Sequence, residues 1–372
     1  MDQREIARLR LRNQRVAGAR LKSAEEVVGR LGAVQSQEYS LARWSVGMRT
    51  VGLQELEVER AVADGRILRT HILRPTWHFV LPADIRPMMR LTARRVNVLT
   101  QRRNEQLGLD SRERARAYDL IVAALSGGRH LTRRELGAAI ERGGISVDGQ
   151  RLAYIVIGAE VELLVCSGAP KGSWQTYALL DERVPLRPDE GAFDSDRALA
   201  DLTRRYFTSH GPATVGDFTW WSSLSTADAR RGIAANGSAL EPLEVGGATY
   251  WWAGDQGTDH PDDPSPTVHL MQGFDEYIVG YRSPRTEINL AGLAPPGALS
   301  RPPFLHAVLL DGQLIGWWRR VTRKEGLGVE TRLLRELGTR EKSALVSAVE
   351  RYASFIDRPV TLPNAQETAS HH

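Results

Sequence analysis

The 372-residue chain is 42% hydrophobic and 25% charged, a composition typical of a globular protein with two to four domains and ample core. Every apolar run is too short to span a bilayer, and the charged N-terminus MDQREIARLR lacks the apolar centre of a signal peptide. Cys166 is the sole cysteine, which excludes an intrachain disulfide and a cysteine-based metal cage. We therefore expect a cytoplasmic protein.

Charge is distributed unevenly along the chain. Residues 1–150 contain 27 Lys or Arg and 17 Asp or Glu, a net charge of +10, whereas the remaining residues carry a net charge of −6. Codon bias explains why only four of the 49 basic residues are lysines. Codon bias does not explain why the N-terminal part is positively charged and the remainder negatively charged. The basic N-terminal part indicates a polyanionic partner, and we expect that partner to be nucleic acid.

The first 80 residues show the order of elements typical of a winged helix. A basic helix or arm over 4–19 precedes predicted helices at 23–34, 40–48 and 54–63. Residues 67–80, ILRTHILRPTWHFV, are rich in β-branched and aromatic residues and are broken by Arg74-Pro75, which predicts a two-stranded hairpin. The next stretch, 82–116, holds nine arginines against four acidic residues and predicts a single basic helix.

Two glutamines, Gln35 and Gln37, stand at the end of the second predicted helix. Residues two apart point to nearly opposite sides of a helix but to the same side of an extended chain. The pair can act on one target only if the helix ends near Val34, and Gly32 favours such an ending. Each carboxamide offers a donor and an acceptor, so the pair can hold a water and a polar ligand atom together. The alternative is that both side chains cap the helix or face solvent.

The same order of elements recurs twice. Helices predicted at 118–125, 132–143 and 150–163 are followed by strands that flank a turn at 168–172, with Lys171 and Trp174 at its tip. After a linker at 183–191, helices predicted at 198–208, 214–221 and 225–234 precede two strands within 240–252. Three copies of one pattern without sequence identity indicate a repeated physical unit.

The C-terminal part has a different pattern. Beyond an acidic loop at 254–266, residues 268–278, 304–318 and 327–333 alternate apolar and polar positions around the turn signal Asp311-Gly312. This predicts an antiparallel β unit, followed by a helix over 341–355. The adjacent carboxylates Asp275 and Glu276 then fall on a strand, where neighbouring side chains face opposite sides. We interpret one of them as structural and not as half of a catalytic pair.

Four segments in this order resemble the AlkZ/YcaQ superfamily of bacterial winged-helix proteins over nearly the whole chain. They are Gln35-Ser36-Gln37, LRPTWHFVLPADI (73–85), GFDEYIVGYR (273–282) and VLLDGQLIGWWRR (308–320). The resemblance implies an α+β protein with three tandem winged-helix units that form a C-shaped, positively charged concave surface, followed by a C-terminal antiparallel β-rich segment and a final helix. The expected boundaries are 1–82 with the glutamine loop, 83–117 as a basic linker helix, 118–184, 192–253 and 265–363.

The resemblance also implies a DNA glycosylase that acts on bulky or crosslinked N-alkylpurines. Gln-apolar-Gln marks the AlkZ branch and Gln-apolar-Asp the YcaQ branch, so Gln37 places the chain in the AlkZ branch, although Ser36 occupies a usually apolar position. Members of that branch are often self-resistance proteins of antibiotic producers. We expect a monofunctional, nucleoid-associated monomer that acts on double-stranded DNA without a cofactor. Because the histidines lack metal-ligand spacing, we expect no metal.

The chemistry of glutamine limits the substrate. Hydrolysis of a glycosidic bond passes through an oxocarbenium-like state. Gln35 and Gln37, which we predict to be catalytic, cannot act as general bases at neutral pH. They can position water and present a carbonyl dipole to the developing sugar cation. This is sufficient for a cationic N7- or N3-alkylated purine, which leaves readily, and it argues against uracil and other uncharged bases.

We predict that DNA is contacted from segments near the glutamine pair and from the second wing tip. The predicted contacts are Arg43, Arg69, His71, Arg74, Thr76, His78, Lys171 and Trp174. Alternatively, His71 and His78 lie in the hydrophobic core and do not contact DNA. We interpret Trp77 and Phe79 as core residues. The pairs Trp220-Trp221, Trp251-Trp252 and Trp317-Trp318 are interpreted as packing residues and not as stacking platforms.

Two other functions are open at this point. A non-catalytic winged-helix transcription regulator shares the expected fold and charge, but the chain shows no obvious dimerisation helix for binding two half-sites. A lesion-binding protein holds damaged DNA without cleaving it. Alkali-induced strand scission of duplex DNA that carries an N7-alkylguanine distinguishes these functions from a glycosylase.

Overall fold

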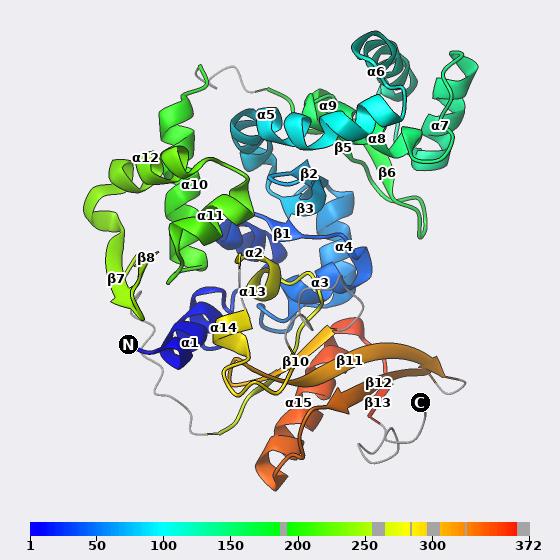
Figure 1. Ribbon diagram of the computed structural model, residues 1–372. Coiled ribbons are helices and arrows are strands. Elements are labelled where there is room, and N and C mark those ends of the chain that lie inside the picture. The colour runs from blue at the N-terminus through cyan, green and yellow to red at the C-terminus, as the bar shows by residue number, and fades with distance from the viewer. Residues whose placement is uncertain (187–191, 255–264, 283–284, 296–305, 324–325, 363–372) are drawn as a thin grey trace.

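The computed structural model is an α+β protein, as expected, in which helices alternate with small and mostly antiparallel sheets (Figure 1). It describes residues 1–186, 192–254, 265–282, 285–295, 306–323 and 326–362. The predicted linker and acidic loop lie largely outside these ranges. Within the described residues, no helix has both the length and the apolar character needed to cross a membrane.

The first group of elements follows the N-terminal helix α1 (Gln3–Asn13). It consists of α2 (Ala24–Leu31), β1 (Val34–Gln35), α3 (Tyr39–Gly47), α4 (Glu55–Ala63), β2 (Leu68–Ile72) and β3 (Thr76–Val80). The strands form a sheet in the order β1-β3-β2, and the predicted hairpin is confirmed. α2 begins at Ser23, whose hydroxyl accepts a hydrogen bond from the N–H of Glu26.

The prediction of a single basic helix over 83–117 is wrong, because two separate helices cover this stretch. α5 (Pro82–Gln106) ends before Gly108, which has a φ of +65°. α6 (Ser111–Leu125) then begins at Asp110, whose carboxylate accepts from the N–H of Glu113. A left-handed glycine followed by an N-cap aspartate ends one helix and starts another.

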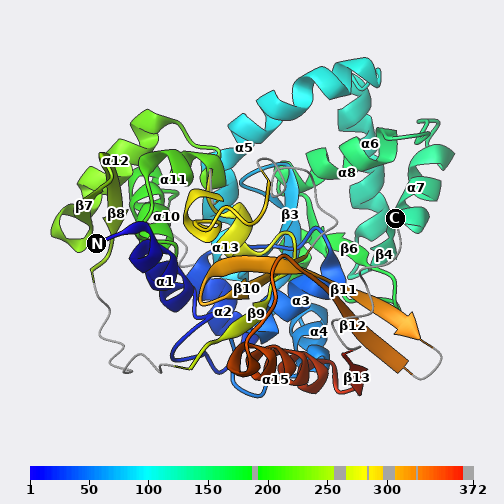
Figure 2. The ribbon, with the colours of Figure 1, turned by 60° about the horizontal axis from the view of Figure 1, so that its bottom comes forward.

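Two further groups follow. The second contains α6, β4 (Leu131–Thr132), α7 (Arg133–Arg142), α8 (Arg151–Val161), β5 (Val165–Ser167), β6 (Thr176–Leu179) and α9 (Leu180–Arg183). The third contains α10 (Ser195–Ser209), α11 (Val215–Ser222), α12 (Thr226–Asn236), a 3₁₀ turn (Gly237–Ala239), β7 (Glu241–Val245) and β8 (Ala248–Trp252). Figures 1 and 2 show the first group between the other two.

The C-terminal part forms a five-stranded sheet in the order β13-β12-β11-β10-β9. Its elements are β9 (Val268–Leu270), α13 (Glu276–Val279), α14 (Arg285–Ile288), β10 (His306–Leu310), β11 (Gln313–Arg323), β12 (Gly326–Leu333), α15 (Thr339–Ile356) and β13 (Val360–Thr361). The predicted turn at Asp311-Gly312 is confirmed, and both residues have positive φ, as a two-residue hairpin turn requires. α15 lies against the sheet (Figure 2).

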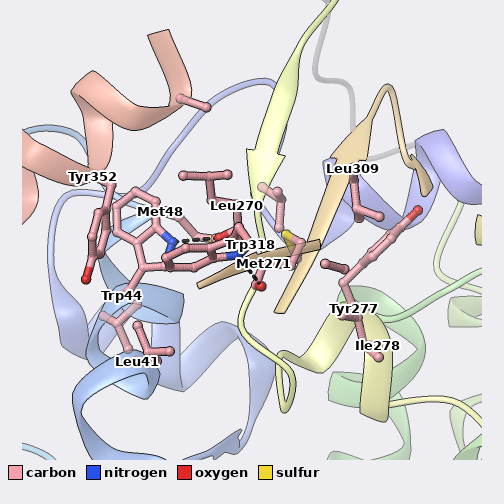
Figure 3. Packing of buried hydrophobic residues seen from close by; sticks show 14 of the residues in the cluster. Leu41, Trp44, Met48, Leu270, Met271, Tyr277, Ile278, Leu309, Trp318 and Tyr352 are labelled. Atoms are coloured by element: carbon pink, nitrogen blue, oxygen red, sulfur yellow. Dashed lines mark hydrogen bonds between the residues drawn. The ribbon is translucent and has the colours of Figure 1, made fainter. Parts of the chain in front are cut away.

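One hydrophobic core joins the first group to the C-terminal sheet. Figure 3 shows Trp44 of α3 beside Trp318 of β11 and Tyr352 of α15. The Trp44 indole donates to the carbonyl of Leu270 at 2.7 Å, and the Trp318 indole donates to that of Met271 at 2.8 Å. These bonds satisfy the polar atoms of two buried aromatic rings. The N-terminal group is therefore completed by elements more than 200 residues later in the chain.

Candidate active site

Gln35 lies in strand β1 and Gln37 in the bend that follows it, so neither glutamine is on a helix. α2 ends at Leu31, and Gly32 follows with a φ of +82°. β1 then pairs antiparallel with β3, so that Val34 lies opposite Phe79 and Gln35 opposite His78. The helix ends before the pair, as the spacing requires, but the predicted helix over 23–34 is too long, because the left-handed conformation at Gly32 terminates α2 at Leu31.

Ser36, between the two glutamines, is fixed on all sides. It is fully buried, its N–H donates to the carbonyl of Trp77 at 2.7 Å, and its carbonyl accepts from Arg69 Nη2 at 2.8 Å. Arg69 Nε lies 3.3 Å from the Ser36 hydroxyl, so serine in this usually apolar position has a polar partner. The Arg69 guanidinium stacks 3.8 Å from the Trp77 ring centre. The loop that carries the glutamines is therefore rigid.

The two glutamines differ in exposure. Gln35 is 4% exposed, and its Oε1 accepts from Arg74 Nη2 at 2.9 Å. A guanidinium can only donate, so the amide oxygen faces Arg74, and Nε2 has no hydrogen-bond partner among the described residues. Gln37 is exposed, and its Oε1 accepts only a long 3.4 Å bond from the N–H of Trp77.

A buried carboxylate lies directly behind Gln35. Glu276 is fully enclosed, and its Oε1 accepts from the main-chain N–H of Gln35 at 2.8 Å. Its Oε2 accepts from the Trp221 indole at 3.0 Å and lies 3.3 Å from His210 Nε2. Burial opposes ionisation, but the hydrogen bond with His210 and the nearby Arg74 guanidinium outweigh it and hold the pKa of Glu276 below its usual value.

The strand predicted for 268–278 is wrong beyond Leu270. Asp275 is the N-cap of α13, and Glu276 is the first residue of that helix. Both carboxylates are fully buried, so they do not face opposite sides of a sheet. Arg49 binds Asp275 through two nitrogens, at 2.8 and 2.9 Å. The alternating sequence pattern here arises from a capped turn inside the core.

Several predicted DNA contacts are placed in the interior. Arg43 is 8% exposed and forms ion pairs with Glu55 and Glu59 of α4. His71 is buried, and its Nδ1 is within hydrogen-bond distance of the Glu160 carboxylate. His78 is fully enclosed, and burial lowers its pKa to about 4. As direct DNA contacts, Arg43, His71, His78 and the buried Arg69 do not fit this structure, because their polar groups are covered by protein.

The remaining predicted contacts are accessible to different degrees. Arg74 and Thr76 are half-buried beside the glutamine loop. Lys171 and Trp174 are exposed on the turn between β5 and β6, where Lys171 forms a 3.1 Å ion pair with Glu135. In the described part of the chain, no group of three His, Cys, Asp or Glu side chains is arranged to hold a metal ion.

Sequence reasoning missed Trp220. Trp221 is fully buried, but Trp220 is 49% exposed, because consecutive helical side chains point about 100° apart. The Trp220 indole donates to the carbonyl of Val279 at 3.1 Å, which also accepts from Arg74 Nη1 at 3.2 Å. Arg74 lies 5.6 Å from the Trp220 ring centre. An anchored aromatic face is thus next to the arginine that holds Gln35.

A family comparison defines the class of this protein. The model of the family described as "DNA glycosylase AlkZ-like" matches residues 28–355, which include the glutamine loop, Glu276 and most of the C-terminal sheet. The chain therefore belongs to the AlkZ-like DNA glycosylase family, and the family expected from the sequence is confirmed.

Two comparisons with individual proteins agree with this assignment. The chain is 26% identical over 339 residues to an interstrand DNA cross-link repair glycosylase from Streptomyces sahachiroi, with 86% of this chain and 88% of the relative covered. It also matches the solved structure of the Streptomyces sahachiroi DNA glycosylase AlkZ with a TM-score of 0.77 at 24% identity. That match covers 97% of this chain and 99% of the other, and it shows a shared fold.

Proposed function

We propose that this protein hydrolyses the N-glycosidic bond of bulky or crosslinked N-alkylpurines of the N7-alkylguanine type in duplex DNA. Membership of a DNA glycosylase family supports the reaction. The name of the Streptomyces sahachiroi relative, an interstrand cross-link repair glycosylase, supports the class of lesion. We further propose that the protein unhooks interstrand crosslinks and protects its host from a DNA-alkylating natural product.

The observation that carries the proposal is the fixed carboxamide of Gln35. Arg74 holds its oxygen, so Nε2 is left to donate a hydrogen bond outward. Gln37 is exposed, and its carbonyl is only weakly engaged. A water that accepts from Gln35 Nε2 and donates to Gln37 Oε1 is oriented by both residues without losing a proton.

A pair of glutamines, which cannot act as general bases, is sufficient for hydrolysis only when the leaving group departs readily. A purine alkylated at N7 is cationic, and it departs as a neutral base when the bond to C1′ breaks. The positive charge then moves to the sugar, where the Gln37 carbonyl dipole stabilises it and the oriented water adds to C1′. The water proton is released to solvent after the C–O bond forms. Neutral bases lack this driving force and are not substrates.

We propose that duplex DNA lies across three winged-helix units, formed by the three groups of helices and small sheets, which together make a basic, C-shaped cradle. α5 links the first group to the second and exposes Arg90, Arg94, Arg95 and Arg102. Lys171 and Trp174 extend from the second group. Contacts of this kind bind phosphates without reading sequence. A monomer is sufficient for such a cradle.

The test is alkali-induced strand scission of a duplex that carries a single N7-alkylguanine. We expect the wild-type protein to generate abasic sites, and we expect Gln35→Ala and Gln37→Ala to lose most of this activity while retaining affinity for undamaged duplex. Gln3→Ala, a partly exposed glutamine of α1, is the matched control and should excise at the wild-type rate. Excision at parental rate by both glutamine variants would remove the pair from the mechanism.

The same experiment separates the alternatives. Tight binding to the lesion without scission identifies a lesion-binding protein. Binding that prefers a defined sequence and ignores the lesion identifies a transcription regulator.

A further inference from the structure

We propose that Glu276 is a positioning residue for the catalytic glutamine, holding the main chain of Gln35 through its ionised carboxylate. This inference rests on the proposed function, because it assigns Glu276 a role that acts through Gln35. Glu276 itself does not reach solvent or substrate, since it is fully enclosed.

The first support is the convergence of hydrogen-bond donors on the carboxylate. Glu276 Oε1 receives the Gln35 N–H at 2.8 Å, and Oε2 receives the Trp221 indole N–H at 3.0 Å, with His210 Nε2 at 3.3 Å. His210 is the C-cap of α10 and Trp221 lies in α11, so the carboxylate connects the strand of Gln35 to the third helical group. A carboxylate is the side chain that accepts from both N–H groups at once, and it also lies beside the His210 imidazole.

The second support is that the adjoining main-chain carbonyl is held from the same segment. Gln272 Nε2 lies 3.4 Å from the carbonyl oxygen of Gln35 and 2.9 Å from the hydroxyl of Ser45. Both polar main-chain atoms of Gln35 are therefore bound by residues 272–276, whereas its side chain is bound by Arg74. The carboxamide has little freedom to move in any direction.

A neutral amide cannot replace the carboxylate. Glutamine at position 276 has one accepting oxygen and one NH₂ group that only donates. If the oxygen faces Gln35, then the NH₂ group points at the N–H of Trp221, and the reverse orientation opposes the N–H of Gln35. Glu276→Gln preserves the size of the side chain and creates a donor-to-donor conflict in the buried site. A displacement of about 1 Å of a catalytic group costs up to about 100-fold in rate.

A double-mutant cycle separates positioning from a purely structural role. The proteins are wild type, Gln35→Ala, Glu276→Gln and the double variant, assayed for single-turnover excision of an N7-alkylguanine with enzyme in excess. The matched control is Asp217→Asn. Asp217 is also a buried carboxylate, but it accepts from Thr214 and from the N–H of Arg282 and has no hydrogen bond to Gln35.

We expect Glu276→Gln to lower the excision rate about 10- to 100-fold and to leave the affinity for duplex with a tetrahydrofuran abasic analogue within about threefold. In the Gln35→Ala background the same substitution should change the rate by less than about threefold. Glu276 acts on the reaction through the side chain of Gln35, and this variant lacks that side chain. Asp217→Asn should have the same relative effect in both backgrounds.

A second measurement does not depend on activity. Hydrogen–deuterium exchange of a peptide that spans residues 33–38 should become faster in Glu276→Gln and remain unchanged in Asp217→Asn. If Glu276→Gln neither accelerates this exchange nor lowers the rate, or if its effect multiplies with that of Gln35→Ala, the positioning role is refuted. If Gln35→Ala alone excises at the wild-type rate, the proposed function of Gln35 fails, and the inference fails with it.

Discussion

Replacing Arg49 by methionine should destabilise the protein more than any surface substitution of equal size. Arg49 is fully buried and makes five hydrogen bonds: two to Asp275, two to Gln14 and one to the carbonyl of Ser45. Methionine fills most of the volume but leaves Asp275 as a buried charge, with only the Ser45 hydroxyl and the N–H of Tyr277 as donors.

The expected loss is about 3–5 kcal/mol, the cost of removing one partner of a buried ion pair. An unfolding entropy of about 2 cal/mol/K per residue gives roughly 0.8 kcal/mol per degree for 372 residues. The melting temperature should therefore fall by about 4–6 °C. Adding Asp275→Asn to the variant should recover part of the loss, because it removes the unpaired charge.

Differential scanning calorimetry measures the effect. The control is Arg335→Met, which breaks a partly exposed two-bond ion pair with Glu341 at 2.7 and 2.8 Å. That substitution should cost less than about 1 kcal/mol, or about 1 °C. A melting temperature of Arg49→Met within one degree of wild type would refute the reasoning that Asp275 depends on this arginine.

Three further predictions concern rate, specificity and pH. Arg74→Met removes the hydrogen bond that holds the Gln35 carboxamide. It should lower the rate of single-turnover excision about 10- to 100-fold, which corresponds to the free energy of a hydrogen bond to a charged group. Trp220→Ala should slow excision of a bulky aromatic N7 adduct by about tenfold and leave N7-methylguanine unaffected in the same assay, because only the large adduct can stack on the indole. Burial lowers the pKa of His78 to about 4 and that of His269 to about 3. In the unfolded chain these histidines have pKa values near 6.5, so they bind protons there at a higher pH than in the folded protein. The free energy of unfolding should therefore fall as the pH drops from 6.5 to 4. His269→Gln should make this fall less steep in thermal melts.

Local signals in the sequence were sufficient for the elements around the site. Gly32 predicted the end of α2 because a left-handed glycine terminates a helix, and the structure has it at φ +82°. Asp311-Gly312 predicted a hairpin for a similar reason. The first of these two signals explains why Gln35 and Gln37 lie outside the helix.

Contacts between distant segments could not be predicted in this way. Gln35 and Glu276 are 241 residues apart, and no local pattern indicates that they meet. The alternation of apolar and polar residues in 268–278 predicts a strand, but a capped turn inside a core can have the same alternation. The pattern indicates which residues are buried and does not indicate which residues they contact. Arg43 and His78 were assigned to DNA from charge and proximity, but nearby acidic residues and burial determine where they lie.

The joint core around Trp44, Trp318 and Tyr352 has a consequence for biosynthesis. Ribosomes release a chain from its N-terminus at about 5–20 residues per second, so α3 emerges long before α15 exists. Until the last hundred residues follow, Trp44 of α3 lacks its partners Trp318 and Tyr352, and Gln35 lacks the carboxylate that accepts from its N–H. A polypeptide that stops before Glu276 therefore lacks the carboxylate that binds the Gln35 N–H, and one that stops before α15 lacks part of the core that packs against α3.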